Sequence, residues 1–177
     1  MLNTNFTIFP VLQTERLTLR QLSPTDEHEI FILRSDDEIN KYLDKKKAET
    51  IGDARNFISK VIENNALYWA VTLSDRNIFA GTICLFSISE ESEKCEIGYE
   101  LLPDFQGQGI MKEAAEKVID YAFNTIKVQR IEAFFHRDNK GSKNLLEKLL
   151  FKNSNEYDKA NPELLCYYLA NPVNNLI

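Results

Sequence analysis

The stretch CEIGYELLPDFQGQGIMKEAA, residues 95–115, predicts a strand, a tight glycine turn and the start of a helix. Ile97, Tyr99 and Leu101 occupy alternate positions and would share one face of the strand. The two glycines at 106–109 allow the backbone to turn with its amides exposed. After the turn, apolar residues recur at helical spacing, which predicts a helix with one buried stripe.

A loop of free N–H groups at a helix N-terminus favours anions, and the helix dipole adds to this preference. The loop is therefore predicted to hold a phosphate-bearing cofactor. A dinucleotide fingerprint would need a third glycine at Lys112, and a P-loop would need Gly-Lys-Ser/Thr after Gly109, so both are excluded. The alternative is a turn that binds nothing, and the loop taken alone leaves the two readings open.

The loop resembles the coenzyme A loop of the GCN5-related N-acetyltransferases, with the pattern Gln/Arg-x-x-Gly-x-Gly/Ala. The residues that match are Gln106, Gly107, Gln108, Gly109 and Ile110. Met111 departs from the general pattern, but with Lys112-Glu113-Ala114 it resembles the branch of ribosomal-protein N-terminal acetyltransferases, the RimJ/RimL type. The same branch is resembled by Thr14-Glu15-Arg16-Leu17-Thr18-Leu19-Arg20, Glu96-Ile97-Gly98-Tyr99 and Asn139-Lys140-Gly141-Ser142.

This resemblance covers the chain from Thr14 to Ala170. It implies an α+β class, the GNAT fold, with a mixed and mostly antiparallel seven-stranded sheet and about four helices on its faces. It implies acetyl-CoA as cofactor, with the pantetheine arm along the central strand, where that strand splays from the next at a bulge. The implied cofactor-binding residues are Leu101, Leu102, Gln106, Gly107, Gln108, Gly109, Ile110, Met111, Asn139 and Ser142.

The resemblance also implies the catalytic groups, Glu96 and Ser142. Glu96 would take the proton of the amine, directly or through water, and Ser142 would donate to the departing sulfur. The alternatives are a solvent-facing strand residue for Glu96, and turn and cap chemistry for Ser142 and Asn139. Glu100 is a weaker candidate, which shares the side of Glu96 only if no bulge intervenes.

The acceptor would be bound by the variable segments 36–50 and 158–163, with Tyr42 and Trp69 as aromatic lining candidates. A lone Trp can equally belong to the core. The basic run Lys45-Lys46-Lys47 is predicted to be a solvated loop. No pattern supports a metal site or an acyl-cysteine intermediate.

The length of 177 residues predicts one acetyltransferase domain, 1–177, beginning with an arm at 1–13 that makes few contacts. The net charge of −6 argues against a nucleic-acid binder. The chain has no apolar run long enough for a membrane span and no secretory pattern, and its three scattered cysteines fit a reducing cytoplasm. The resemblance leaves a homodimer possible.

Other segments predict the remaining elements. Ser23 with Pro24 and Asp26 predicts a helix start, and Ser142 is predicted to cap a helix from Lys143 to Leu150. Leu150 stands where the family has glycine, which implies a different end to that helix. The expected strands lie at 17–20, 68–73, 79–87, 130–135 and 164–169, with another beginning near 151 and a hairpin turn at 75–77.

The predicted function is acetyl transfer from acetyl-CoA to a primary amine, by direct transfer in a ternary complex. The acceptor would be a protein N-terminus or a small amine. The alternative is a non-catalytic module that binds acyl-CoA and has a regulatory role.

Overall fold

An eight-stranded sheet runs through the molecule in the order β1-β2-β3-β4-β5-β6-β8-β7. The computed structural model describes residues 2–3, 6–43, 45–157 and 161–172. The strands are β1 (Leu12–Gln13), β2 (Leu17–Gln21), β3 (Tyr68–Leu73), β4 (Ile78–Ser89), β5 (Lys94–Leu101), β6 (Arg130–His136), β7 (Lys152–Tyr157) and β8 (Leu164–Ala170). Among the strands of these described residues, only β5 and β6 pair in parallel. The mixed, mostly antiparallel sheet is confirmed. It has eight strands rather than the expected seven, and the additional strand is the short β1.

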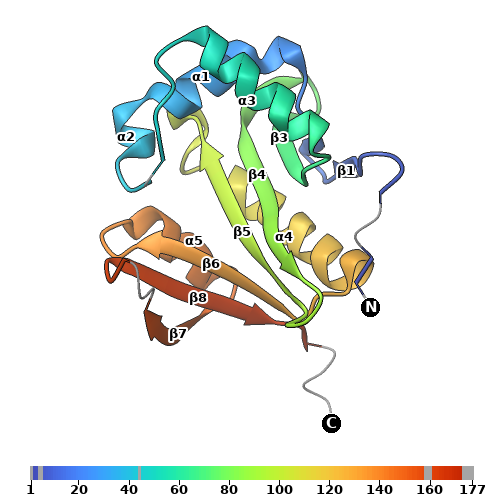
Figure 1. The fold of residues 1–177 in the computed structure, drawn as a ribbon, viewed down its shortest axis with the longest axis vertical. Coiled ribbons are helices and arrows are strands. Elements are labelled where there is room, and N and C mark those ends of the chain that lie inside the picture. The colour runs from blue at the N-terminus through green and yellow to red at the C-terminus, as the bar shows by residue number, and fades with distance from the viewer. Residues whose placement is uncertain (1, 4–5, 44, 158–160, 173–177) are drawn as a thin grey trace.

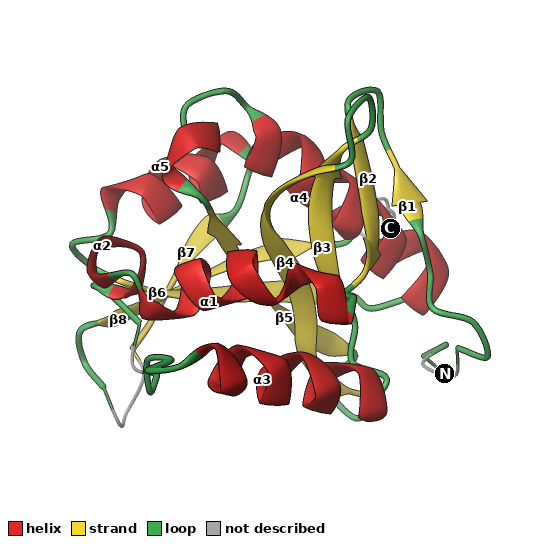
Figure 2. Ribbon diagram, turned by 90° about the horizontal axis from the view of Figure 1, so that it is seen from above, coloured by secondary structure: helices red, strands yellow, loops and turns green. Residues whose placement is uncertain are grey.

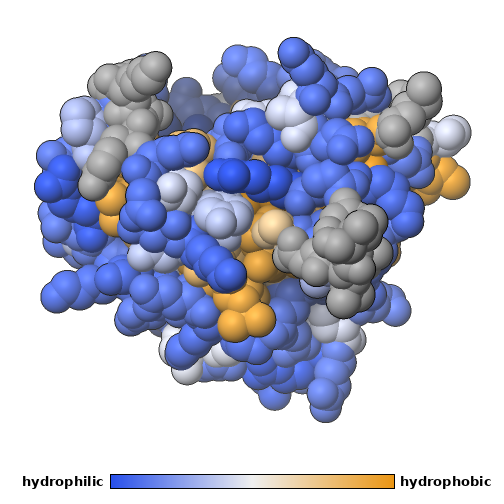
Figure 3. Space-filling model, turned by 90° about the horizontal axis from the view of Figure 1, so that it is seen from below, coloured by the Kyte–Doolittle hydropathy of each residue, from blue (hydrophilic) through white to orange (hydrophobic). Residues whose placement is uncertain are grey.

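Helices cover both faces of the sheet (Figures 1 and 2). The α-helices are α1 (Glu27–Ser35), α2 (Asp37–Asn40), α3 (Ile51–Glu63), α4 (Ile110–Tyr121) and α5 (Lys140–Lys148). The apolar stripes of α1 and α3 pack with Ala70 and Phe79 on one face. The stripe of α4 packs on the other face, in a larger core that also includes Leu146 of α5. The molecular surface seen from below in Figure 3 is mainly hydrophilic, with apolar residues gathered in small areas.

Local signals account for several of these boundaries. Ser23 and Asp26 form the predicted capping box, although the first turn is a 3-10 turn that leads into α1. The hairpin turn between β3 and β4 is also as predicted, with Asn77 at φ 51°. The single-turn helix α2 was not predicted. Its N-cap is Asp36, whose carboxylate accepts the N–H groups of Glu38 and Ile39.

The N-terminal segment makes more contacts than expected of an arm. The side chain of Leu2 is 6% exposed, and Leu12 pairs with Leu19 as part of β1. Phe9 meets the ring of Trp69 edge-on at 5.8 Å, and the Trp69 indole N–H donates to Pro10 O at 2.7 Å. The prediction of few contacts is therefore wrong, because these apolar side chains complete the core on that side.

Helix α5 corrects two predictions. Its N-cap is Asn139, whose Oδ1 accepts the Ser142 N–H at 3.0 Å, so Ser142 lies inside the first turn rather than at the cap. At the other end Leu150 adopts φ +66°. Leu150 N–H donates to Glu147 O and Phe151 N–H to Leu146 O, which is the Schellman pattern that glycine usually completes. Hence Leu150 adopts the conformation that glycine usually supplies, and the prediction of a different helix end is wrong.

The feature that positions the site is the separation of β5 from β6. The two strands pair only from Lys94–Glu96 to Arg130–Glu132. Beyond that point the pairing stops in the described part of the chain, and Figure 1 shows the strands diverging. Strand β5 stays in register with β4 from Glu96 to Leu101, so the predicted splay is present without a bulge in this part of β5.

Candidate active site

The glycine loop joins β5 to α4 with its amides uncovered. Gly107 and Gly109 adopt φ +72° and +77°, which a residue with a side chain rarely adopts. Gly109 is the N-cap of α4 and offers no side-chain cap, and the first helical bond runs from Glu113 N–H to Gly109 O at 3.1 Å. The leading N–H groups of α4 therefore have the environment that binds anions.

Side chains hold this loop in shape. Gln106 Nε2 donates to Leu101 O at 3.3 Å, and Gln108 Nε2 donates to Asp104 O at 2.7 Å. A Cβ at Gly107 would meet nothing within 4 Å, so there is room above the loop. Ile110 and Met111 are buried in the core. Of the predicted loop residues, these two can therefore offer only backbone N–H groups to a cofactor, and the departure at Met111 leaves the loop open.

Two motif segments that are far apart in sequence meet beside the loop. Glu113 accepts the Thr14 hydroxyl at 2.5 Å, the Arg16 backbone N–H at 3.0 Å and Arg16 Nε at 2.6 Å. Burial raises the pKa of Glu113, but the hydrogen bonds from Thr14 and Arg16 outweigh it, and the pKa lies below its ordinary value. Arg16 Nη1 also donates to Gln108 O at 3.2 Å. From the sequence, Thr14, Arg16 and Glu113 were identified only as parts of segments that resemble the family, and no role was predicted for them.

Strand β5 presents its open edge to the gap. Leu102 N–H donates to Ala80 O at 2.9 Å, so the alternation of an antiparallel ladder directs the backbone groups of Tyr99 and Leu101 away from β4. On the other side of the gap lies α5. Burial raises the pKa of Tyr99 to about 12, and a hydrogen bond with Ser142 opposes the rise. The structure therefore brings Ser142 to β5, while Asn139 remains its helix cap.

A pocket of about 230 Å³, here called the β5 pocket, lies beside β5 on the face covered by α1 and α3. Its lining includes Arg34, Lys45, Phe57, Tyr68, Cys84 and Glu100. The Glu100 side chain is 11% exposed and forms an ion pair with the Lys45 ammonium. Tyr99 also borders the pocket, so the pocket and the gap meet at β5. The prediction that the run 45–47 is solvated is therefore wrong for Lys45.

The β5 pocket is electrostatically unusual. The Tyr68 hydroxyl lies 3.5 Å from Glu100 Oε2 and 3.2 Å from the Thr82 hydroxyl. Burial and the nearby Glu100 charge raise the pKa of Tyr68 well above its ordinary value, and they raise that of Cys84 to about 12. Both groups are neutral near pH 7, so Glu100 is the anion that faces a cation in this pocket.

Glu96 lies at the vertex of the gap. It pairs in register with Phe86 on β4 and Glu132 on β6 and is half-buried. Because no bulge interrupts β5 here, Glu96 and Glu100 lie on the same face, about 13 Å apart along the strand. The prediction that Glu100 shares the side of Glu96 if no bulge intervenes is therefore confirmed. Because of the distance between them, the two carboxylates lie in different parts of the site.

The predicted acceptor-binding aromatics separate. Trp69 is fully buried in the core and lines no part of this site. Tyr42 stacks on His136 with ring centroids 5.3 Å apart, so the segment after α2 reaches the end of β6. Of the predicted loop 158–163, residues 158–160 lie outside the described residues.

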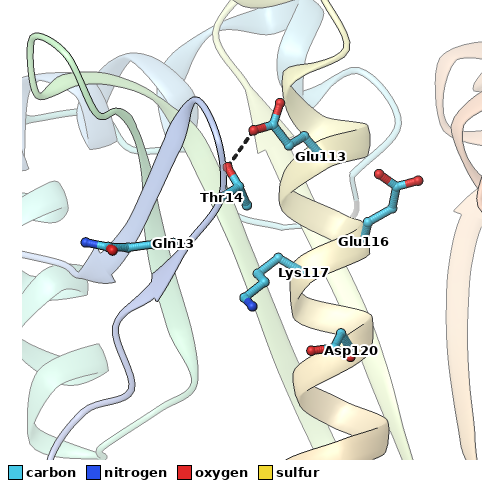
Figure 4. Close-up of a pocket in the computed structure, with 6 residues that line it drawn as sticks. All are labelled: Gln13, Thr14, Glu113, Glu116, Lys117 and Asp120. Atoms are coloured by element: carbon cyan, nitrogen blue, oxygen red, sulfur yellow. Dashed lines mark hydrogen bonds between the residues drawn. The ribbon is translucent and has the colours of Figure 1, made fainter.

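A second depression of about 410 Å³ lies between β1 and α4 (Figure 4). Figure 4 shows the polar side chains that line it, among them Glu113 bonded to Thr14. This hollow is lined by none of the loop glycines and is open to solvent. It is therefore a surface feature beside the Arg16 contacts rather than the reaction site.

Within the described part of the chain, His, Cys, Asp and Glu side chains do not gather in groups of three that could hold a metal ion. Within the same ranges, every helix is too short or too polar to cross a membrane.

Comparison with known proteins agrees with this geometry. The family model of the acetyltransferase (GNAT) domain matches residues 16–152. The uncharacterized N-acetyltransferase YoaA of Bacillus subtilis (strain 168) is 32% identical over 149 residues, which cover 82% of this chain and 84% of YoaA.

Solved structures share the fold. An acetyltransferase (GNAT family) from Bacillus anthracis has a TM-score of 0.82 at 26% identity, covering 92% of this chain and 99% of that one. Spermidine N-acetyltransferase from Vibrio cholerae, solved with CoA and spermine, has a TM-score of 0.78 at 21% identity, covering 89% and 97%. Since the family model spans most of its length, the chain belongs to the GCN5-related N-acetyltransferases, enzymes that take the acetyl group from acetyl-CoA.

Proposed function

We propose that this enzyme transfers the acetyl group directly to a primary amine bound in the β5 pocket, in a ternary complex. The observation that carries the proposal is the arrangement around β5. The glycine loop follows the C-terminal end of β5, and the open edge of β5 faces the gap. The β5 pocket, in which the Lys45 ammonium pairs with Glu100, borders the same strand. Two substrates can thus approach one strand from different sides, which direct transfer requires.

For acetyl-CoA, the loop N–H groups from Gly107 to Met111 are proposed to bind the pyrophosphate. The open edge of β5 at Tyr99 and Leu101 is proposed to bind the pantetheine arm, whereas the backbone groups of Leu102 are bonded to Ala80 and Phe105. The open space above Gly107 and the uncapped N-terminus of α4 support the pyrophosphate assignment. Gln106 and Gln108 act through the loop by holding backbone carbonyls. Acetyl-CoA supplies the activated acetyl thioester; the groups of this chain bind and orient it.

For proton transfer, the amine must lose a proton before it attacks. Glu96 is proposed as the proton acceptor, through a chain of water molecules along β5, because it is half-buried at the vertex of the gap, about 13 Å from Glu100. Ser142 is proposed to donate a hydrogen bond to the departing sulfur, supported by its contact with Tyr99 across the gap. Asn139 orients Ser142 by capping α5.

The acceptor is proposed to be a small cationic amine, with a protein N-terminus as the competing class. The Lys45 ammonium in the β5 pocket favours the former, because it shows that a slim primary amine fits beside Glu100. A protein N-terminus is favoured by the resemblance to the RimJ/RimL branch. The name of the spermidine enzyme among the structural neighbours makes polyamines a reasonable first panel.

The test is turnover of acetyl-CoA with a panel of alkylamines, polyamines and peptides with free N-termini. Gly107→Asp places a carboxylate where the phosphates would lie, and should abolish acetyl-CoA binding by calorimetry as well as turnover. Glu96→Gln should lower kcat while acetyl-CoA binding is kept. If Glu96→Gln retains kcat and Glu100→Gln loses it, Glu100 is the proton acceptor. Binding without turnover on any amine would instead support a non-catalytic acyl-CoA-binding module.

A further inference from the structure

Lys45 occupies the β5 pocket with a chemical group of the acceptor's own class. Its side chain is 25% exposed, and its ammonium donates to Glu100 Oε1, whereas the adjacent Lys46 is exposed. A lysine side chain is a primary amine on an unbranched alkyl chain. Lys45 therefore presents to Glu100 what a small alkylamine would present.

Glu100 requires a cation at this position. A carboxylate that is 11% exposed loses most of its hydration, and a neutral neighbour such as the Tyr68 hydroxyl at 3.5 Å replaces it only weakly. The other cation that lines the pocket is Arg34, whose guanidinium lies 4.0 Å above the Phe57 ring. The ammonium on Glu100 is thus the charge that compensates the carboxylate, and a second ammonium could serve the same purpose.

Lys45 can leave without unfolding its segment. The backbone on either side of it is held by other contacts: Tyr42 stacks on His136, and Ala48 N–H donates to Arg34 O at 2.9 Å. Lys47 is paired separately with Asp37. Rotation of the long Lys45 side chain is therefore enough to free Glu100, since such side chains have many accessible rotamers.

We propose that Lys45 is an internal substitute for the acceptor, and that acceptor binding displaces its ammonium from Glu100. The inference rests on the proposed function, because it takes the β5 pocket as the acceptor site. It narrows the acceptor to amines that arrive protonated and have a slim alkyl group beside the nitrogen. It also makes Glu100 the residue that selects for positive charge and Lys45 the competitor that weakens acceptor binding.

The experiment is calorimetric titration of spermidine, and separately of butylamine, into protein saturated with desulfo-CoA, which cannot transfer an acetyl group. Lys45→Met removes the competitor and should tighten amine binding by roughly fivefold. Lys45→Arg keeps a competing cation and should bind the amines no more tightly than the wild type does. Lys46→Met is the matched control one residue away and should also leave binding unchanged.

Glu100→Gln removes the selecting charge and should weaken binding of both amines, while desulfo-CoA binding and the thermal melting of the protein report that the variant is folded. Unchanged or weaker amine binding in Lys45→Met would overturn the proposal, as would wild-type amine binding in Glu100→Gln. These titrations need no turnover. If Lys45→Met tightens amine binding but no amine is acetylated, this inference stands and the proposed reaction is wrong. If amines are acetylated but Lys45→Met does not change amine binding, the proposed reaction stands and this inference is wrong.

Discussion

At the scale of single residues, Leu150 is held in a conformation that suits glycine. Its φ is +66°, and its side chain is 74% exposed, so it gains little from packing. The left-handed conformation costs an L-residue about 1 to 2 kcal/mol, part of which glycine would return through its greater freedom in the unfolded chain. Leu150→Gly should therefore raise the free energy of unfolding by about 1 kcal/mol.

Urea denaturation of the wild type and the variant checks this. Leu150→Asn is the intermediate case, since asparagine tolerates the left-handed region better than leucine. Leu150→Ala is the control, because it shortens the exposed side chain and keeps the strain. A Leu150→Gly variant less stable than Leu150→Ala would show that the exposed leucine makes a contribution that its geometry does not reveal.

The residues of the β5 pocket mark the limit of prediction at this scale. Glycine positions could be read from the sequence because their backbone requirement is local. The pairing of Lys45 with Glu100 could not, because it joins residues from different elements, and a basic run next to a helix is usually solvated. The sequence contains one signal of the pocket, which is the presence of Glu100 on the same side of the strand as Glu96.

At the scale of elements, Arg16 ties the start of β2 to the glycine loop. It donates to Gln108 O in the loop and to Glu113 in the first turn of α4. Losing these bonds would let the loop carbonyl turn toward the proposed phosphate site, so Arg16→Gln should raise the KM for acetyl-CoA roughly tenfold, equivalent to about 1.4 kcal/mol. The KM for the amine should change little.

Steady-state kinetics with each substrate varied in turn, and desulfo-CoA titration, measure this split. Arg16→Lys should recover part of the affinity, since it keeps the charge but not the two-directional geometry of the guanidinium. Arg55→Gln is a matched control, because Arg55 forms an exposed ion pair with Glu27 away from the loop. Equal loss of affinity for both substrates would indicate general destabilisation instead.

The same contacts predict a pH dependence of stability. The pKa of Glu113 is lowered below 4.5 in the folded protein by the hydrogen bonds from Thr14 and Arg16, despite its burial. A lowered carboxyl pKa contributes stability above the unfolded value and loses it as the pH falls through the folded value. Glu113→Gln should thus lower the melting temperature at pH 7, and the difference from wild type should shrink below pH 4.5. A difference that stays constant down to the acid transition would assign the effect to packing.

Prediction of the elements succeeded where the signal was periodic and failed where it was short. The amphipathic stripe of α4 and the strands β3, β4 and β5 could be predicted because burial of one face imposes a repeat. The two-residue β1 and the single turn α2 contain too few residues to show a repeat. The N-cap of α5 was predicted to be Ser142, but it is Asn139. Both residue types are good N-caps and they lie three positions apart, so local sequence chemistry does not decide between them.

At the scale of the whole molecule, the N-terminal segment belongs to the core of the fold. Phe9 lies against Trp69, which in turn meets Tyr121 of α4 at 5.9 Å. Phe9→Ala should lower the free energy of unfolding by about 2 kcal/mol, less than for a fully buried ring. Ile8 is the control in the same segment, since it is 84% exposed, and Ile8→Ala should stay within about 0.5 kcal/mol. Thermal or urea unfolding compares the two, and equal effects would contradict the packing role.

The net charge of −6 bears on how the proposed cationic acceptor would reach the β5 pocket. A negative protein attracts cations over a distance that salt shortens, so the KM for a cationic amine should rise with ionic strength. Spermidine carries more positive charge than butylamine, and its KM should rise more steeply with added NaCl. Lys45→Met makes the pocket more negative by one charge and should steepen both dependences, whereas Lys46→Met changes the net charge equally but away from Glu100. If the two variants show the same salt dependence, the overall field governs acceptor capture; a steeper dependence in Lys45→Met alone locates the attraction at Glu100.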